Sequence, residues 1–442
     1  MKHARLLALL AAVVLAQGSP ALATSVTVSW DPEPDAEVAG YVVYYGFESG
    51  DYSESVDVGD RTSWRFESLR AGAKYYFAVR AYNADRDMGE YSEERVADLT
   101  SRTFQPRIPR LADLNGDGRD DVGLYDRRSG AYMVAYSTRG GFRTAAGQWG
   151  PDMLTTSANL DGNAAGDFVL YSPKDGTWVE AVSRGHGRFE YASGQWVPDG
   201  EVHASDFDGD GVDDLLFYHP ETGQLFVALN DGTGRLSFHA GASLARAEVF
   251  TGRFDGNATT DVLFYDRERG AWSVALSDGA GGLREIPGDA APGWEIHVGR
   301  LDADTRDDLF MYHPDSGSWA EARTVGEGMF SYASGTWVPA LQVGLSDFNG
   351  DRRDDLLAYD AASGNAAVCF GSPAEEFSCA GSRWAPNGQP SIGDLDGDGF
   401  NDVLLYQAQT GAWFRYLTVA PGQFSSQSAR WAAGLDFAER RR

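Results

Sequence analysis

Alternating apolar and polar residues predict β-strands along most of the chain. Near its beginning, the segments Ser25–Trp30 (SVTVSW) and Tyr41–Tyr45 (YVVYY) follow this pattern. Trp272–Leu276 (WSVAL) and Trp413–Leu417 (WFRYL) repeat it much later. Helical periodicity is missing throughout, so the pattern predicts an all-β protein.

An acidic nonapeptide occurs seven times after residue 108, at intervals of 46 or 47 residues. In every copy a tyrosine follows the first position by twelve residues, and a glycine follows the tyrosine by five. Each repeat therefore reads as a strand, the acidic loop, a second strand ending at the tyrosine, a turn closing on the glycine, and two further strands. The first positions are Asp113, Asn159, Asp206, Arg253, Arg300, Asp347 and Asp394.

Four short strands at a period of about 47 residues are typical of a β-propeller blade, and seven blades can close a ring. A four-stranded sheet cannot bury both of its faces alone, so neighbouring blades must cover them. The sequence leaves open whether the ring closes by exchange of a terminal strand, although Ala432–Phe437 (AAGLDF) could begin one.

The chain divides into five parts. Lys2 and Arg5, an apolar run, and Ala21-Leu22-Ala23 predict an export signal over 1–23 that is cleaved after Ala23, hence a secreted, periplasmic or cell-surface protein. A separate strand-rich unit covers 24–100, a linker 101–107, the repeats 108–434, and a C-terminal tail 435–442. No later stretch approaches the roughly 20 apolar residues that a membrane span needs, so we expect no membrane insertion.

The net charge of −28 and the pI near 4.5 disfavour nucleic acid and anionic membranes as partners, because both would be repelled. Many of the acidic side chains lie in the seven loops, where a cation would neutralise them. The two cysteines, Cys369 and Cys379, are ten residues apart in one repeat. In an oxidising compartment we expect them to form a disulfide, and the alternative is a pair of inert buried thiols.

Four of the loops place oxygen atoms at alternate positions, as a Ca²⁺ site with six to eight oxygen ligands requires. We expect side chains at positions one, three, five and nine to bind, together with the backbone carbonyl at position seven. The predicted ligands are Asp113, Asn115, Asp117, Arg119 and Asp121; Asp206, Asp208, Asp210, Val212 and Asp214; Asp347, Asn349, Asp351, Arg353 and Asp355; and Asp394, Asp396, Asp398, Phe400 and Asp402. The alternative is an acidic β-turn without an ion. A calcium ion here would stabilise the fold, because clustered carboxylates repel one another.

Three loops depart from this pattern. The second has only the carboxylates of Asp161 and Asp167, beside Asn159 and Asn163, and the sequence leaves its calcium binding open. The fourth and fifth begin with Arg253 and Arg300, whose guanidinium groups we expect to neutralise the loops in place of an ion.

The segment Leu69–Asn83 closely resembles the signature of fibronectin type III domains around the corner between strands E and F. Trp30 stands where that family has its strand B core tryptophan. The resemblance covers about 80 residues and implies a β-sandwich with Tyr75 in the tyrosine-corner role.

The loops, the period and the seven copies strongly resemble the FG-GAP (or VCBS) repeats of integrin alpha-subunit propellers and of many secreted bacterial proteins, from about Ile108 to Trp431. This resemblance implies calcium in the hairpin between the first two strands of a blade, on the lower face. The Phe-Gly and Gly-Ala-Pro pairs that name the family are not clearly present. The expected architecture is a fibronectin type III sandwich followed by a seven-bladed β-propeller.

None of the strong catalytic motifs occurs, and His219 and His313 occupy equivalent turns, which repetition explains. On the face opposite the loops, tryptophans could stack on sugar rings, or they could fill gaps between blades. The candidates are Trp149, Trp196, Trp337 and Trp384, with Trp294 and Trp431 in the same connections. The sequence therefore favours an exported, calcium-stabilised, non-enzymatic binding or adhesion protein whose ligand is a glycan or an extracellular protein. A polysaccharide-degrading lyase or hydrolase and a structural envelope component are the alternatives.

Overall fold

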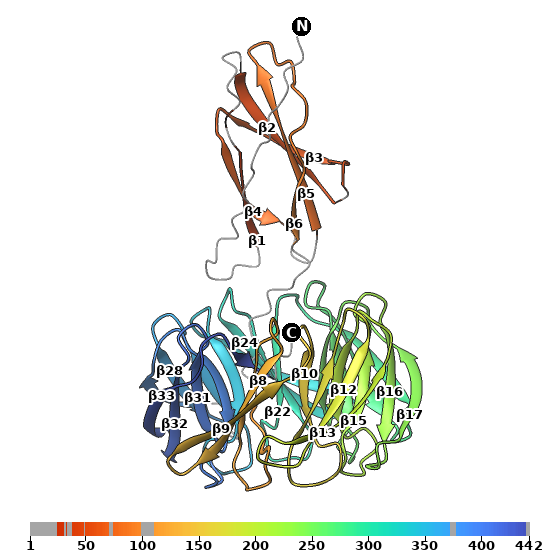
Figure 1. Cartoon of the computed structure of the whole chain (residues 1–442), viewed down its shortest axis with the longest axis vertical. Helices are drawn as coiled ribbons and strands as arrows, with labels where there is room; N and C mark the ends of the chain where they lie inside the picture. The colour runs from red at the N-terminus through yellow and green to blue at the C-terminus, as the bar shows by residue number, and fades with distance from the viewer. Residues whose placement is uncertain are drawn as a thin grey trace. The chain divides into compact units, whose positions relative to one another are not determined.

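The computed structural model describes residues 24–98, except 31, 33–37, 48 and 70–73, together with 110–371 and 377–438. Every regular element in these ranges is a β-strand, which confirms the all-β prediction (Figure 1). They contain no helix long and apolar enough to cross a membrane. The chain forms two compact units, Met1–Phe104 and Gln105–Arg442. The expected export signal (1–23) and linker (101–107) lie outside the described residues.

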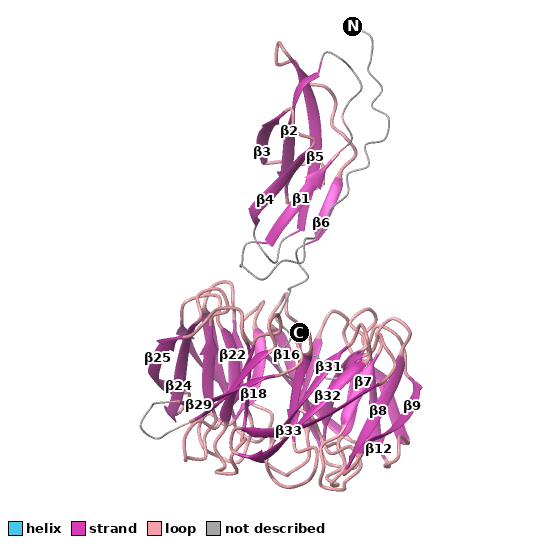
Figure 2. Cartoon of the chain, turned by 90° about the vertical axis from the view of Figure 1, so that its left-hand side faces the viewer, coloured by secondary structure: helices cyan, strands magenta, loops and turns pink. Residues whose placement is uncertain are grey.

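The first unit is a pair of antiparallel sheets that share one core (Figure 2). Its core contains Val28, Val43 and Phe77, which come from both sheets. Trp30 is buried there and meets the ring of Tyr41 edge-on, with 5.6 Å between the ring centroids. One sheet pairs β1 (Thr24–Ser29) with β4 (Ser63–Leu69); the other has the order β3 (Glu54–Gly59), β2 (Val38–Gly46), β5 (Lys74–Asn83), β6 (Arg95–Asp98).

The described part of the second unit contains seven four-stranded antiparallel sheets, here called blades one to seven. In blades two to seven the four strands follow one another along the chain. Their first strands are β10 (Leu154–Ala158), β14 (Glu201–Ser205), β18 (Glu248–Gly252), β22 (Glu295–Gly299), β26 (Gln342–Ser346) and β30 (Gln389–Gly393). Their second strands are β11 (Asp167–Tyr171), β15 (Asp214–Tyr218), β19 (Asp261–Tyr265), β23 (Asp308–Tyr312), β27 (Asp355–Tyr359) and β31 (Asp402–Gln407).

The outer strands complete each blade. The third strands are β12 (Thr177–Ser183), β16 (Gln224–Asn230), β20 (Ala271–Ser277), β24 (Ser318–Gly326), β28 (Asn365–Phe370) and β32 (Ala412–Ala420). The fourth strands are β13 (Phe189–Gln195), β17 (Leu236–Ala242), β21 (Leu283–Asp289), β25 (Met329–Thr336), β29 (Ser378–Arg383) and β33 (Gln423–Arg430). All five residues of β11, β15, β19, β23 and β27 are buried, because neighbouring blades cover both faces, whereas the fourth strands are largely exposed.

Blade one joins the two ends of the unit. Its strand order is β34 (Asp436–Phe437), β7 (Val122–Tyr125), β8 (Ala131–Thr138) and β9 (Gly141–Gln148). Asp436 pairs with Tyr125 and Phe437 with Leu124. The ring therefore closes by strand exchange, the possibility that the sequence left open. The segment expected as a tail, 435–442, supplies this strand, so the propeller extends to at least Ala438, whose N–H donates to the carbonyl of Gly123.

The repeated tyrosines tie each blade to the connection that leads to the next one. The Tyr312 hydroxyl donates a hydrogen bond to the carbonyl of Val338 at 2.8 Å and accepts one from the N–H of Leu341 at 3.2 Å. In blades two to seven the tyrosine donates to the carbonyl 26 residues further on, and in blade one Tyr125 donates to the carbonyl of Gly150, 25 residues further on. The repeated glycine is needed because Gly270, for example, has a φ of 79° and a Cβ there would lie 1.9 Å from the Ala290 carbonyl oxygen.

Candidate metal centres in the acidic loops

Each acidic loop lies between the first and second strands of a blade, and its nine residues are numbered here as positions one to nine. In loops one, three, six and seven, the aspartate at position one accepts hydrogen bonds from N–H groups of its own loop. In loop seven, Asp394 accepts from Gly397 at 2.7 Å and from Gly399 at 2.9 Å. In loop six, Arg352 stands in place of the second glycine with a φ of 69°, and its N–H still donates to Asp347 at 2.7 Å. The position-one carboxylate thus curls the loop in either case.

The aspartate at position nine is buried in all seven loops. Asp402 accepts from the N–H of Leu395 in its own loop at 2.9 Å, and from Thr418 in the third strand at 2.7 Å. Burial, together with the nearby carboxylates of Asp396 and Asp394, raises the pKa of Asp402 to about 8, although the hydrogen bonds from Thr418 and Leu395 lower it. The same burial raises the pKa of Asp214 and Asp355 to about 7. Because loops with arginine at position one keep this arrangement, position nine anchors the fold whether or not a metal binds, a role that the sequence did not reveal.

Loops three and seven bring three carboxylates together. One oxygen from each of Asp206, Asp208 and Asp210 lies within 4.8 Å of the others, and the same holds for Asp394, Asp396 and Asp398. Oδ1 of Asp396 is buried and has no hydrogen-bond partner. Burial and the neighbouring carboxylates raise the pKa of both Asp208 and Asp396. A dication would satisfy the unpartnered oxygen and the mutual repulsion, so these residues fit Ca²⁺.

Loops one and six contain an asparagine at position three and an arginine at position seven. The amide of Asn115 donates to Asp121 at 2.8 Å, and the amide of Asn349 donates to Asp355 at 3.2 Å. Arg353 pairs with Asp351 at 2.6 Å, and Arg119 lies 3.5 Å from Asp117. The carboxylates predicted as ligands in these loops therefore already have positively polarised partners.

Loop two obtains a cation that was not predicted, and loop five obtains one from a residue other than Arg300. Arg184 in blade two pairs with Asp161 at 2.6 Å, and Arg306 pairs with Asp304 at 2.6 Å. Arg253 and Arg300 are exposed, and neither forms an ion pair with its own loop among the described residues. Burial raises the pKa of Asp307, at position eight of loop five, and the guanidinium groups of Arg300 and Arg253 lower it, so both act on that loop through space. The expectation that the two arginines pair with the other carboxylates of loops four and five is not confirmed.

Every loop is hydrogen-bonded to its neighbour. The N–H at position eight of one loop donates to the carbonyl at position one of the preceding loop, at 2.6 to 3.1 Å. The donor and acceptor pairs are Gly166 and Asp113, Asp213 and Asn159, Thr260 and Asp206, Asp307 and Arg253, Asp354 and Arg300, Asn401 and Asp347, and Asp120 and Asp394. Since the last pair links blade one to blade seven, the seven loops form a closed ring.

The side chain at position seven reaches the neighbouring loop. A Cβ on Gly397 would lie 3.2 Å from Cγ of Arg119, and one on Gly350 would lie 2.9 Å from the Phe400 ring. A Cβ on Gly162 would lie 3.3 Å from Cγ2 of Val212. The glycine at position four therefore leaves room for the adjacent loop.

The tryptophans proposed to bind a ligand pack between blades instead. Trp149 and Trp384 are only 8% and 5% exposed. Trp149 stacks on Tyr132 at 4.1 Å, and Trp384 stacks on Tyr416 of the next blade at 4.7 Å between ring centroids.

The other indoles are partly buried in similar aromatic contacts, so gap filling is the role that the structure supports. Trp196 packs on Trp178 and Trp337 on Trp319, while Trp294 meets His313 and Trp431 meets Trp413. Among the described residues of the second unit, the exposed aromatic side chains are instead Tyr191 (55%), Phe238 (56%) and Tyr332 (61%), at equivalent positions in β13, β17 and β25. The near-repeat of Tyr191–Pro198 (YASGQWVP) and Tyr332–Pro339 (YASGTWVP) was the available sequence signal.

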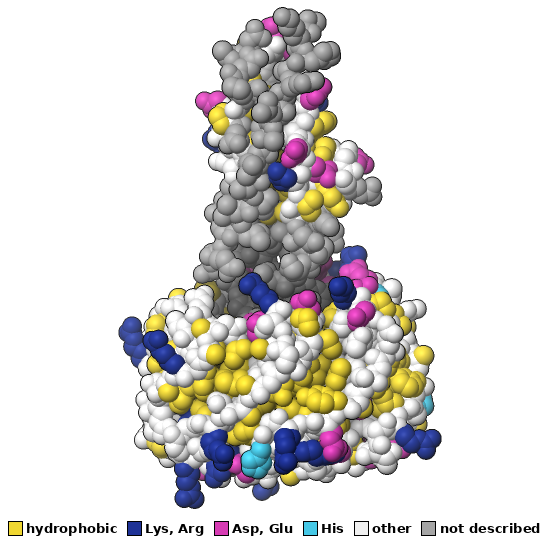
Figure 3. Space-filling model, viewed as in Figure 1, with side chains coloured by type: hydrophobic (Ala, Val, Ile, Leu, Met, Phe, Trp, Pro, Cys, Tyr) yellow, Lys and Arg dark blue, Asp and Glu magenta, His cyan; other side chains and the backbone are white. Residues whose placement is uncertain are grey.

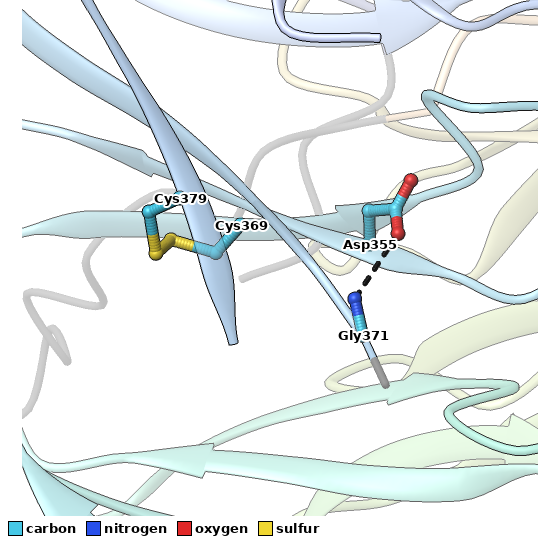
Figure 4. Close-up of a disulfide and its surroundings, with 4 residues drawn as sticks. All are labelled: Asp355, Cys369, Gly371 and Cys379. Carbon is cyan, nitrogen blue, oxygen red and sulfur yellow. Dashed lines mark hydrogen bonds between the residues drawn. A yellow bond between two sulfur atoms is a disulfide. The ribbon is translucent and has the colours of Figure 1, made fainter. Parts of the chain in front are cut away.

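Cys369 and Cys379 form the expected disulfide across β28 and β29 (Figure 4). Two residues after Cys369, the N–H of Gly371 donates to Asp355 of loop six at 3.3 Å. The six other blades have Ser, Asn or Thr at this place, and their side chains bond to loop carbonyls. Blade six, which contains the disulfide, has no side-chain bond of this kind because its residue there is Gly371.

Comparisons with known proteins agree with this architecture. Residues 16–97 match the fibronectin type III domain, which the first unit contains. Two solved structures of low identity are similar in fold alone, as multi-sheet propeller-like proteins. One, from Lactobacillus plantarum, is 13% identical with a TM-score of 0.50, covering 71% of this chain and 96% of that one. The other, a functionally unknown protein from Desulfotomaculum acetoxidans, is 9% identical with a TM-score of 0.50, covering 72% and 98%.

A curated relative matches over a shorter stretch. The Kelch domain-containing protein SSO1033 of Saccharolobus solfataricus is 34% identical over 100 residues, which are 23% of this chain. The match spans 13% of that protein's length.

Proposed function

We propose that the protein is an exported, calcium-stabilised propeller of the FG-GAP/VCBS type that binds a glycan or an extracellular protein without catalysing a reaction. The single observation that carries the calcium part is the triad in loop seven, where Oδ1 of Asp396 is buried among carboxylates without a hydrogen-bond partner. The expected ligands are the four predicted sets, in loops one, three, six and seven. When bound, calcium would neutralise the carboxylates and hold each loop in its curled form.

The bound metal would stabilise the contacts between neighbouring blades of the propeller. Position one of each loop accepts a hydrogen bond from the next loop, so an ion that fixes position one also steadies the contact between two blades. Extracellular calcium modules typically have dissociation constants of about 10⁻⁴ to 10⁻³ M, which suits a protein that remains loaded outside the cell.

The outer side of the second unit, which the exposed fourth strands of the blades form, is a better candidate for the ligand surface than the buried tryptophans. In Figure 3, hydrophobic and uncharged side chains cover this side, while charged ones gather towards its two ends. Tyr191 and Tyr332 present exposed rings on outer strands of two different blades. Aromatic side chains of this kind stack on sugars and anchor protein partners, and two equivalent weak sites on one molecule would add avidity.

A glycan array probed with the mature protein, with calcium and with chelator, tests the binding role. We expect binding in calcium that falls when Tyr191 and Tyr332 are replaced by alanine. Met329→Ala is the control, because Met329 is an exposed apolar but not aromatic side chain on a fourth strand, β25, and should leave binding unchanged. Absence of a glycan signal, together with capture of one specific surface protein, would assign the ligand to the protein class.

N-terminal sequencing of the exported protein tests the export signal, and we expect the mature chain to begin at Thr24.

A further inference from the structure

The four loops proposed to bind calcium differ in the charges that they already contain. At the five positions predicted to bind (one, three, five, seven and nine), loops three and seven each have four aspartates, with an apolar residue, Val212 or Phe400, at position seven. At the same positions, loops one and six each have three aspartates, with Asn at position three and Arg119 or Arg353 at position seven. Counting these residues alone, the formal charge is −4 in loops three and seven, and −3 + 1 = −2 in loops one and six.

In loops one and six the arginine at position seven forms an ion pair with a carboxylate that calcium would need as a ligand. Arg353 lies 2.6 Å from Asp351 and also donates its backbone N–H to that carboxylate at 2.9 Å. Arg119 lies 3.5 Å from Asp117, and its Nε donates to the carbonyl of Asp396 in loop seven at 3.1 Å. An incoming ion must displace the guanidinium from the carboxylate and then remain beside a like charge.

The triads of loops three and seven have no such competitor among the described residues. No ion pair reaches the three carboxylates at positions one, three and five of either loop. The buried Arg415 is the cation that acts on Asp396 through space, yet its guanidinium donates to the carbonyl of Thr138 and to Gln427, both at 2.9 Å. Oδ1 of Asp396 remains without a hydrogen bond.

We infer that the loops bind calcium in two classes, tightly in loops three and seven and weakly in loops one and six, with the position-seven arginine setting the difference. This inference rests on the proposed calcium binding. Affinity at such sites rises with the number of carboxylate ligands, so we expect dissociation constants to differ by about tenfold or more between the classes.

Calorimetric titration of calcium into the full mature chain, stripped of metal, tests the inference. We expect two tight sites followed by two weak ones. Asp208→Asn and Asp396→Asn should each remove one site from the tight class. Arg353→Met and, independently, Arg119→Met should each tighten one weak site, because methionine keeps the apolar stem and removes the charge.

Arg306→Met is the matched control. Arg306 also stands at position seven and pairs with Asp304 at 2.6 Å, but its loop begins with Arg300, so the number and affinity of calcium sites should not change. Four sites of equal affinity, or arginine variants that leave the weak class unchanged, would overturn the inference and leave calcium binding intact. No calcium uptake at all would overturn both. A thermal melt of each metal-free variant in parallel separates lost folding from lost binding.

Discussion

At the scale of single residues, the repeated tyrosine joins each blade to the connection that leads to the next blade. Six of the seven side chains are at most 1% exposed, and each hydroxyl both donates and accepts within the protein. Burial without those partners would leave a backbone carbonyl and an N–H unsatisfied. The position-nine aspartate works in the same way at the other end of the second strand, where it joins its loop to the third strand.

Replacing Tyr312 by phenylalanine should therefore destabilise the protein by about 1–3 kcal/mol, because the Val338 carbonyl and the Leu341 N–H lose their common partner. The measurement is the free energy of unfolding in urea, with calcium held constant. Tyr332→Phe is the control, since Tyr332 is 61% exposed and should change stability little. Equal stability of both variants would mean that water replaces the lost hydroxyl in Tyr312→Phe.

At the scale of elements, the blades were predictable because their signals are local. The fixed spacing of strand, loop and tyrosine predicted the seven repeats, and the alternation of apolar residues predicted their strands. Contacts between distant residues were not predictable in this way. Arg184 neutralises Asp161 from 23 residues further along, and Trp149 is covered by Phe189 of the next blade. The sequence does not state which side chains of neighbouring blades meet, so it left open whether those tryptophans bind a ligand or fill gaps between blades.

Ring closure depends on one short element, β34. Deleting 435–442 should expose the edge of β7 and remove the buried side chains of Leu435 and Phe437, at a cost of about 3 kcal/mol or more. Thermal unfolding of the truncated chain in calcium measures the effect. The matched control deletes only 439–442, which leaves β34 and the bond from Ala438 to Gly123 in place. If both truncated chains melt together, β34 does not hold the ring closed.

At the scale of the whole molecule, the ring of loops concentrates buried carboxyl groups on one face of the propeller. Burial raises the pKa of Asp121, Asp214, Asp308 and Asp355 to about 7 and that of Asp402 to about 8. In the unfolded chain these groups have pKa values near 3.9. The metal-free folded protein therefore holds protons that the unfolded chain releases, and its free energy of unfolding falls as the pH rises from about 4 to about 8.

Calcium should oppose this loss of stability at higher pH, because it binds the ionised carboxylates that a higher pH produces. In chelator, we expect the melting temperature to fall by several degrees between pH 5 and pH 8. In calcium it should fall much less, so the stabilisation by calcium should grow with pH. Asp396→Asn supplies the control within the same molecule. It should reduce the calcium effect at pH 8 and leave most of the metal-free pH dependence, because among the five position-nine aspartates Asp396 raises the pKa of Asp402 alone. A calcium effect of equal size at both pH values would show that the buried carboxyls of the ring are not coupled to the metal.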